Sequence, residues 1–341
     1  MRRVSLALLG ALAIAACSDD DNNTGNNNPP VFVNSALVAD IGGLGAATTD
    51  VNLKNPWGVA LNSATGFLWV ANNGTGTATV YQPNGTIVSL IVTIPTSGAV
   101  TGGKPTGVVY NATTDFVIPS SGAATFLFAG EDGVISGWNQ SLGTSAKVVA
   151  DRSGSGASYK GIALLGGSLF AANFKNNKVD MFDNTFTFVK SFTDANVPAG
   201  YGPFNVAAIG NELFVAYAKI DAATGDEIKG AGNGYISVFS STGTFLRSFA
   251  SAGNLNAPWA ITTAPASFGS FAGAILVGNF GDGKINVFSA SDGSLVGTLK
   301  TSSGDLSLDG LWGLVVTNST LFYAAGVQDE SHGVFGTITK Q

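Results

Sequence analysis

The sequence predicts an all-β fold built from repeated units. Glycine accounts for 46 of the 341 residues, while only 11% of the residues are charged and 45% are hydrophobic. This composition differs from the Ala, Glu, Lys and Leu balance of helical proteins. Short runs of Val, Leu and aromatic residues, separated by Asn-Gly and Thr-Gly turns, favour strands and tight turns. A repeat fold would let a chain of this length bury a large core without dividing into separate domains.

One unit of three strands recurs six times, at a spacing of about 50 residues. Residues 55–81, NPWGVALNSATGFLWVANNGTGTATVY, show it most clearly, with an innermost strand, an apolar second strand and a third strand that ends in a large residue. The third strands are expected at residues 76–81, 133–138, 177–182, 234–239, 283–288 and 333–338. Because this period is typical of propeller blades, the sequence predicts a six-bladed β-propeller.

The fourth strand of the last blade is expected from the other end of the chain. A fourth strand follows the third in the first five units, but the sixth unit ends at Gln341. Residues 36–40, ALVAD, match residues 147–151, KVVAD, which form a fourth strand of the second blade. We therefore expect residues 35–40 to complete the sixth blade and close the ring, which leaves few exposed strand edges.

The N-terminal region predicts export and lipidation. Residues 1–16 read as a signal peptide, because Arg2 and Arg3 precede an apolar run too short to span a bilayer. Residues 14–17, IAAC, resemble a bacterial lipobox, and Cys17 is the single cysteine of the chain. The alternative is an ordinary cleavage site beside an unrelated cysteine. Residues 17–30 would then be the lipidated Cys17 with a disordered polar tether, and residues 31–341 the propeller.

These features predict an exported lipoprotein of the bacterial outer membrane, on its periplasmic side or on the cell surface. The lipid anchor makes the membrane one partner. The formal net charge of −6 becomes more negative when the signal peptide is removed with its two arginines. Nucleic acid is excluded as a partner, because phosphate binding needs clustered Lys and Arg side chains.

One face of the propeller is expected to carry the binding site. It combines the loops before the innermost strands with the loops between the second and third strands, and we call it the loop face. Each innermost strand places one residue near the axis, and we call these residues the axial column. Its four aromatic rings would form a platform for a sugar ring or a flat apolar group, or would pack as core. The column consists of Trp57, Thr106, Lys160, Phe204, Trp259 and Trp312.

The loops between the second and third strands add further polar candidates. Asn72, Asn173, Asn279 and Asp282 complete the candidate binding face. The longest of these loops spans residues 220–233 in the fourth blade, and long loops on a rigid scaffold are usually functional or disordered. Its charged residues are Asp221, Asp226, Glu227 and Lys229.

No complete catalytic motif is present. The single histidine, His332, excludes sites that need several His ligands. Residues 98–104, GAVTGGK, have the spacing of a phosphate loop, but they continue into Pro105 and a strand rather than a helix. An oxygen-rich set on the loop face is the remaining candidate site, for one divalent cation. This set contains Glu131, Asp132, Asn173, Asn279 and Asp282.

The repeat resembles a family of exported bacterial six-bladed propeller proteins related to the NHL-repeat and SMP-30-like propellers. The stretches that carry the resemblance include NPWGVA from Asn55, EDGVISGW from Glu131, VGNFGDGKINVF from Val277 and LFYAAGVQDESHGVFG from Leu321. The resemblance extends from about residue 35 to residue 338. It implies the propeller fold and no particular activity.

Two hypotheses about function follow from these observations. The first is a lipid-anchored binding module that engages a protein, a glycan or a small molecule through its loop face. The alternative is a metal-dependent hydrolase or lyase of the sugar-lactonase type, whose metal would be held by the oxygen-rich set. The missing catalytic set favours the binding module over an enzyme.

Overall fold

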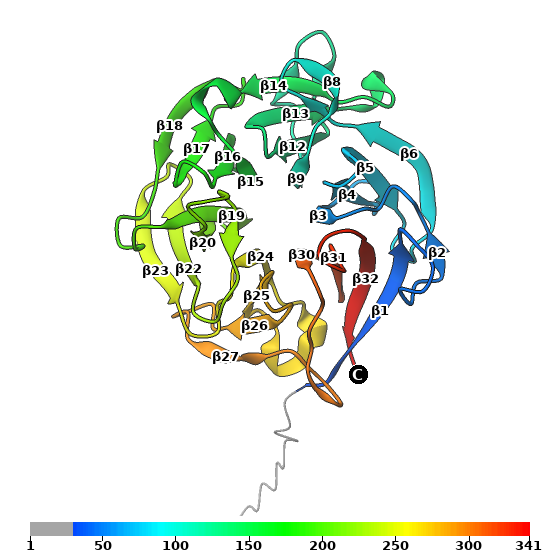
Figure 1. Cartoon of the computed structure of the whole chain (residues 1–341), viewed down its shortest axis with the longest axis vertical. Helices are drawn as coiled ribbons and strands as arrows, with labels where there is room; N and C mark the ends of the chain where they lie inside the picture. Colours follow the sequence, from blue (N-terminus) through cyan, green and yellow to red (C-terminus); the bar gives the residue numbers. More distant parts are fainter. Residues whose placement is uncertain (1–29) are drawn as a thin grey trace, which may run out of the picture.

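The structure is a computed structural model that describes residues 30–341. Within that range the chain forms six antiparallel sheets arranged as blades around one axis, as Figure 1 shows. The predicted all-β, six-bladed β-propeller is therefore confirmed. Cys17, the signal peptide and the tether lie outside the described residues.

Each of the first five blades runs from an innermost strand to a fourth, outer strand. Blade one contains β3 (Pro56–Leu61), β4 (Leu68–Asn72), β5 (Thr77–Tyr81) and β6 (Ile87–Thr93). Blade two contains β9 (Pro105–Tyr110), β12 (Phe126–Gly130), β13 (Val134–Trp138) and β14 (Lys147–Asp151). Blade three contains β15 (Tyr159–Leu165), β16 (Ser168–Asn173), β17 (Lys178–Phe182) and β18 (Phe188–Phe192). Blade four contains β19 (Tyr201–Ile209), β20 (Glu212–Ile220), β22 (Gly234–Ser240) and β23 (Phe245–Ser251). Blade five contains β24 (Pro258–Thr263), β25 (Ile275–Asn279), β26 (Ile285–Phe288) and β27 (Leu295–Thr298).

Short elements decorate the connections between these strands. The two-stranded ribbons are β7 (Pro95–Thr96) with β8 (Ala99–Gly102), β10 (Val117–Ile118) with β11 (Gly122–Ala123), and β28 (Lys300–Thr301) with β29 (Gly304–Asp305). Strand β21 (Glu227–Ile228) pairs with β20 inside the long loop of blade four. The 3₁₀ helices are η1 (Gln140–Leu142), η2 (Ser153–Ser155) and η3 (Ala266–Phe271).

Blade six is completed by the N-terminal strand, as predicted. Its own strands are β30 (Leu311–Thr317), β31 (Thr320–Ala325) and β32 (Val334–Lys340). Strand β1 (Phe32–Ala39) pairs antiparallel with β32, and the short β2 (Thr48–Thr49) lies parallel to β1. Strand β1 begins at Phe32, earlier than the predicted start at residue 35. In Figure 1 the blue strand β1 and the red strand β32 run side by side.

The boundaries between blades are built from one repeated pair of side chains. A residue of the second strand in one blade and a large residue at or near the end of the third strand in the next blade share a buried core cluster. The pairs are Trp69 with Trp138, Leu127 with Phe182, Phe170 with Phe239, Phe214 with Phe288, Leu276 with Ile338, and Phe322 with Tyr81. Burial of these large apolar groups holds neighbouring blades together without covalent links.

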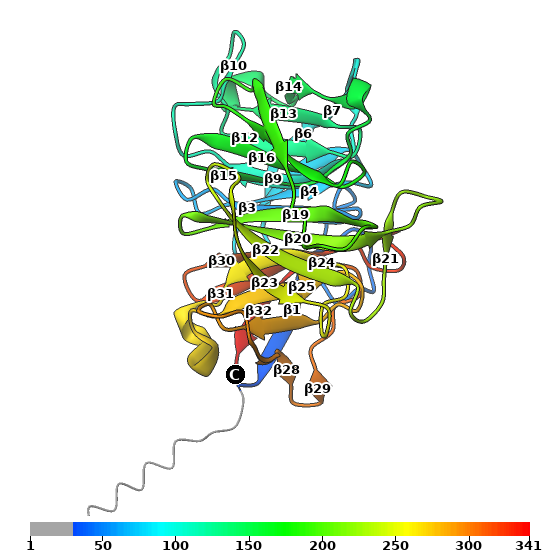
Figure 2. The ribbon, with the colours of Figure 1, turned by 90° about the vertical axis from the view of Figure 1, so that its left-hand side faces the viewer.

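The two faces of the ring carry different features. Figure 2 shows the ring from its side, with the loop that contains β21 projecting from one face and η3 lying on the other. The face with β21 is the loop face. None of the helices within residues 30–341 is long and apolar enough to cross a membrane.

Candidate functional site

The axial column forms a buried plug rather than an open platform. Trp57 stacks on Trp312 with ring centroids 3.5 Å apart, and Trp312 stacks on Phe280 at 3.9 Å. Trp259 meets Trp57 edge-on, while Phe204 tilts against Trp312. All these rings are buried, and Trp312 is 0% exposed. The expectation of a stacking surface for a ligand is therefore wrong, and the core interpretation describes these aromatic side chains.

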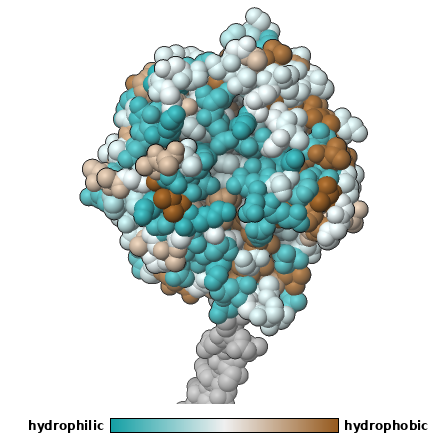
Figure 3. Space-filling view, viewed as in Figure 1, coloured by the Kyte–Doolittle hydropathy of each residue, from teal (hydrophilic) through white to brown (hydrophobic). Residues whose placement is uncertain are grey.

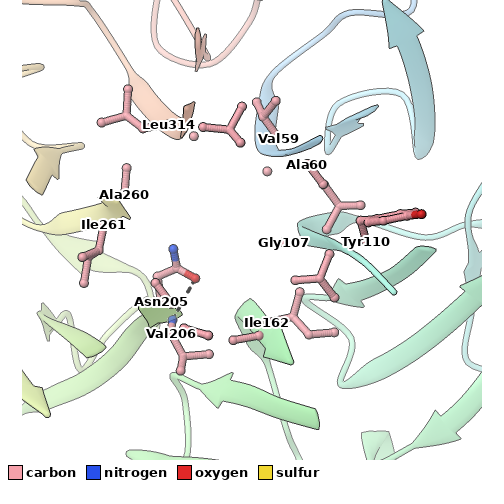
Figure 4. A pocket seen from close by; sticks show the side chains of 18 of the residues that line it. Val59, Ala60, Gly107, Tyr110, Ile162, Asn205, Val206, Ala260, Ile261 and Leu314 are labelled. Carbon is pink, nitrogen blue, oxygen red and sulfur yellow. Dashed lines mark hydrogen bonds between the residues drawn. The ribbon is translucent and has the colours of Figure 1, made fainter. Parts of the chain in front are cut away.

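Behind this plug lies the central channel, a cavity of about 370 Å³ lined by the innermost strands of all six blades. Figure 4 shows mostly small and aliphatic side chains around it, including Val59, Ile162 and Leu314. Asn205 also lines the channel, where its side-chain amide donates to the carbonyl of Trp259 at 2.8 Å. A Cβ atom at Gly161 would lie 1.9 Å from Asn205 Oδ1, so only glycine fits there. Trp57, Phe204 and Trp312 lie one position before channel-lining segments, whereas Trp259 itself borders the channel.

Lys160 is the charged member of the column, and it joins three blades at the axis. Its side chain is 5% exposed, and Nζ lies 2.9 Å from Glu131 Oε1 of blade two. Two carboxylates of the long blade-four loop face the same ammonium group, with Asp226 Oδ1 at 3.6 Å and Glu227 Oε2 at 3.7 Å. The ammonium group also lies 5.1 Å from the centre of the Trp57 ring, within range of a cation–π interaction. Thr106, the other polar member, is buried and donates to the carbonyl of Tyr159.

The charges of this cluster shift one another's pKa values. Burial alone would lower the pKa of Lys160, but Glu131, Glu227 and Asp226 outweigh burial and raise it. For Glu131, burial works to raise the pKa, yet the Lys160 ammonium and the Asn73 amide together hold the pKa below its usual range. Burial dominates at Glu227 and raises its pKa, because Lys160 opposes it only in part. Lys160 and Glu131 are therefore the ionised pair at neutral pH.

A fourth carboxylate, that of Glu330, lies near the Lys160 ammonium group on the blade-six side. Glu330 accepts a hydrogen bond from Asn55 Nδ2 at 2.8 Å, and Asn55 Oδ1 accepts one from the Trp57 indole at 3.2 Å. Burial raises the pKa of Glu330, while Asn55 and Lys160 oppose that rise. Glu227 Oε2 is buried without a hydrogen-bond partner among the described residues, although it lies within ion-pair distance of Lys160. Carboxylates therefore outnumber the buried ammonium group around the axis.

A polar cleft, which we call the axial cleft, opens beside Lys160 on the loop face. It has a volume of about 360 Å³ and lies between the turn of blade two, the loop that contains η2, and the long loop of blade four. Figure 3 shows this face, where hydrophilic residues surround the centre of the ring. Asp226, with 65% of its side chain exposed, is the most accessible carboxylate near Lys160. The charged or hydroxyl side chains that line the cleft are Glu131, Asp132, Ser153, Ser158, Lys160, Lys175, Thr224 and Asp226.

The asparagines of the candidate face are structural. Asn72 donates to the Thr79 hydroxyl at 3.0 Å, and Asn173 donates to Asp180 at 2.9 Å. Asn279 donates both to the carbonyl of Asn254 and to Asp282. All three asparagines are 0% exposed and end the second strands of blades one, three and five. Their amide Nδ2 groups bind the third strand, a turn aspartate or a neighbouring loop, whereas Oδ1 of Asn72 and of Asn279 has no hydrogen-bond partner among the described residues.

The oxygen-rich set does not converge on one point. Glu131 binds Lys160, whereas Asp132 accepts hydrogen bonds from the Ser97 amide and the Thr96 hydroxyl. Asn173 is held by Asp180 in blade three, whereas Asn279 and Asp282 bind each other in blade five. Within residues 30–341, no group of three or more His, Cys, Asp or Glu side chains is placed to hold a metal ion. The expected cation site is therefore not formed by these five residues.

Several residues of the charged cluster were absent from the sequence-based candidate set. Asp226 and Glu227 fall in the long loop singled out by its length, but nothing in the sequence shows that this loop reaches Lys160. Asn55 and Glu330 were recognisable only as polar residues flanking Trp57 and His332. The histidine itself pairs with Asp40, with Nδ1 2.8 Å from Oδ2, at the point where β1 meets blade six.

No family model matches this chain. Among solved structures, a streptogramin B lyase superposes with a TM-score of 0.55 at 12% identity, covering 91% of this chain and 98% of the lyase. A catalytically inactive histidine-to-alanine variant of virginiamycin B lyase from Staphylococcus aureus, solved with quinupristin, gives a TM-score of 0.52 at 14% identity. It covers 90% of this chain and 98% of the lyase. At such low identity these likenesses show the propeller fold alone.

Relatives with similar sequences occur in Acanthamoeba polyphaga mimivirus. Its Uncharacterized protein R648 is 36% identical over 313 residues, which cover 86% of this chain and 77% of the viral protein. Its Uncharacterized protein L690 is 32% identical over 313 residues, which cover 86% of this chain and 82% of that protein. The alignments span most of both partners, so this six-bladed propeller belongs to the same protein family as the mimivirus proteins R648 and L690.

Proposed function

We propose that this chain is a binding module whose ligand occupies the polar cleft beside Lys160. The observation that carries the proposal is the burial of an ion-paired lysine at the axis, directly next to a cleft lined by charged and hydroxyl groups. Buried ionised groups need close partners, and they cluster at functional sites more often than elsewhere. The ligand is a protein, a glycan or a small molecule that presents polar groups to this cleft.

Two observations support the cleft as a prepared site. Lys160 is held by blades two and four through Glu131 and Glu227, so its position is fixed before a ligand arrives. Asp226 and Lys175 are exposed and have opposite charges. A cleft with a rigid floor and exposed charges at its rim orients a ligand and selects it specifically, because little conformational entropy is lost on binding.

The alternative function is a metal-dependent hydrolase or lyase of the sugar-lactonase type. The fold is compatible with it, since propellers host both interaction modules and lyases. The described residues weigh against it, because the oxygen-rich set is divided among separate partners. We therefore place the binding module first.

The two functions are separated by one set of binding measurements on the purified protein. Glycan and peptide microarrays should reveal a ligand whose binding weakens about tenfold in Asp226→Asn and in Thr224→Trp, a change that fills the cleft. Asp292 lies in an exposed turn of blade five, so Asp292→Asn is the matched control and should leave binding unchanged. A ligand that binds all three variants equally would contradict the proposal that the ligand occupies this cleft.

Metal titration tests the alternative function, the metal-dependent hydrolase or lyase. Calcium, manganese and zinc are titrated into the protein by calorimetry. Saturable micromolar binding of one of these ions, lost in Glu131→Gln or in Asn279→Ala, would favour the hydrolase over the binding module. Weak metal binding that is the same in the wild-type protein and in both variants would favour the binding module over the hydrolase.

We also propose that the module is attached to a bacterial outer membrane through lipidated Cys17. The support is the lipobox-like IAAC at residues 14–17, followed by the polar residues 18–30. A kinship with the NHL-repeat and SMP-30-like propellers is part of the same proposal and rests on the repeat motifs. The anchor would hold the propeller at the periplasmic side or at the cell surface.

A further inference from the structure

The boundary between blades one and two departs from the repeat at both of its key positions. Trp69 occupies the second-strand position that is Leu or Phe in the other five blades. Trp138 occupies the end of the third strand, which is Tyr, Phe or Ile elsewhere. The two rings meet with centroids 4.7 Å apart, and Trp69 also stacks on Phe126 at 4.1 Å. Both departures thus meet at one boundary.

A cavity of about 410 Å³ lies at this same boundary. Its walls are aromatic and aliphatic, and its volume falls within the roughly 300–1,000 Å³ typical of small-molecule sites. The β3–β4 turn and the loop after β13 border it, away from the axial cleft. The apolar lining residues are Phe67, Trp69, Val80, Val88, Leu90 and Trp138.

The chemistry of the lining defines the class of ligand. None of the lining residues carries a charge, whereas the axial cleft contains both charges. The polar lining side chains are the amides of Asn62 and Gln140 and the hydroxyls of Thr65, Thr125 and Thr144. An apolar wall with a few neutral hydrogen-bonding groups disfavours ions, because an ion would lose its hydration without gaining a counter-charge.

We propose that this cavity is a second binding site, for a neutral ring compound that is mainly apolar and has a polar edge. The ring packs against the partly buried Phe67, Val88 and Leu90. It also meets the edges of Trp69 and Trp138, which are 4% and 5% exposed, and its polar edge reaches the amides and hydroxyls at the rim. This site lies apart from the axial cleft, so it does not depend on the function proposed for Lys160.

The test uses Nile red, a neutral aromatic dye whose emission rises in apolar surroundings, on the full-length protein. We expect saturable binding of one dye per chain. Binding should weaken about tenfold in Trp69→Phe/Trp138→Phe, since a lost aromatic contact is worth about 1 kcal/mol or more. Other blades use Phe at both positions, so this variant is compatible with the fold.

Two further measurements make the result decisive. Thr144→Trp fills the mouth of the cavity from an exposed loop and should abolish binding, whereas Thr242→Trp, in an exposed turn of blade four, should not. The anionic dye 8-anilinonaphthalene-1-sulfonate should bind at least tenfold more weakly than Nile red. Failure of Nile red to saturate, equal binding to Thr144→Trp, or equal affinity for the anionic dye would each overturn the proposal.

Discussion

Lys160 and Glu131 form an ion pair at the axis of the ring, with Nζ and Oε1 2.9 Å apart. The lysine belongs to blade three and the glutamate to blade two, while Glu227 reaches the same ammonium group from blade four. One buried side chain therefore links three consecutive blades at the mouth of the central channel. Its replacement tests both the stability of the plug and the integrity of the cleft.

Lys160→Met should lower the free energy of unfolding by about 3 kcal/mol. Removing one partner of a buried ion pair leaves the remaining carboxylates without compensation, and losses of roughly 3–5 kcal/mol follow. Chemical denaturation at pH 7 measures the change. Lys284→Met is the control, because its pair with Asp305 is about 40% exposed and should contribute less than about 1 kcal/mol. Equal losses in both variants would show that Lys160 is not a structural charge.

The raised pKa of Glu227 predicts a pH-dependent contribution to stability. Burial raises the pKa of Glu227 in the folded state, so the native protein holds its proton more tightly than the unfolded chain. That contribution is fully present below the unfolded pKa, near 4.5, and is lost as the pH rises through the folded pKa. Glu227→Gln should therefore gain stability relative to the wild-type protein at pH 7, and this gain should shrink at pH 5.

Urea denaturation of both proteins at pH 5, 6 and 7 measures this difference. Because Glu330 helps to raise the pKa of Glu227, the same comparison in a Glu330→Gln background separates the two carboxylates. A stability difference that grows as the pH falls would contradict the assignment.

Local pattern was enough to predict the fold but not the site. Residues 76–81, 133–138 and 234–239 could be recognised as third strands because each begins with a glycine, a residue typical of turns, and ends in a large aromatic residue. By contrast, the pairing of Lys160 with Glu227 depends on how far the long blade-four loop folds across the axis. Loop conformation is set by contacts distant in sequence, which no periodicity encodes.

The aromatic residues of the axial column also show that local sequence does not determine a site. Its spacing correctly placed Trp57, Trp259 and Trp312 together near the axis. Whether such rings face solvent or one another depends on the width of the ring of blades, which one blade does not determine. Here the rings are close enough to stack, and they fill the mouth instead of lining it.

The lipid-anchor prediction is tested by Cys17→Ser. Cells that express the full-length protein are labelled with a radioactive fatty acid and then separated into membrane and soluble fractions. The wild-type protein should incorporate label and remain with the membrane, whereas the variant should incorporate none and become soluble, because the cysteine carries the acyl chains. A variant that still sediments with membranes would contradict the lipobox interpretation. Proteolysis of intact cells then distinguishes the cell surface from the periplasmic side.

Ring closure depends on the inward-facing side chains of β1. Leu37 is only partly buried, whereas Phe32 and Val38 are fully buried and anchor the strand. The Phe32 ring lies 4.7 Å from that of Phe268, so β1 also binds the neighbouring η3. Phe32→Ala should therefore lower the free energy of unfolding by about 3–4 kcal/mol.

Val33→Ala is the matched control for this substitution. Val33 is the next residue of the same strand, its side chain is 37% exposed, and its loss should cost less than about 1 kcal/mol. Deleting residues 32–41 should go further, because it exposes the edge of β32 from Val334 to Lys340 and removes the whole ladder of β1. That loss is comparable with the entire stability of a domain, so the truncated protein should aggregate or unfold without cooperativity. Deleting residues 18–30 should leave the melting temperature nearly unchanged. A protein that lacks residues 32–41 yet melts like the wild-type protein would show that β1 does not close the ring.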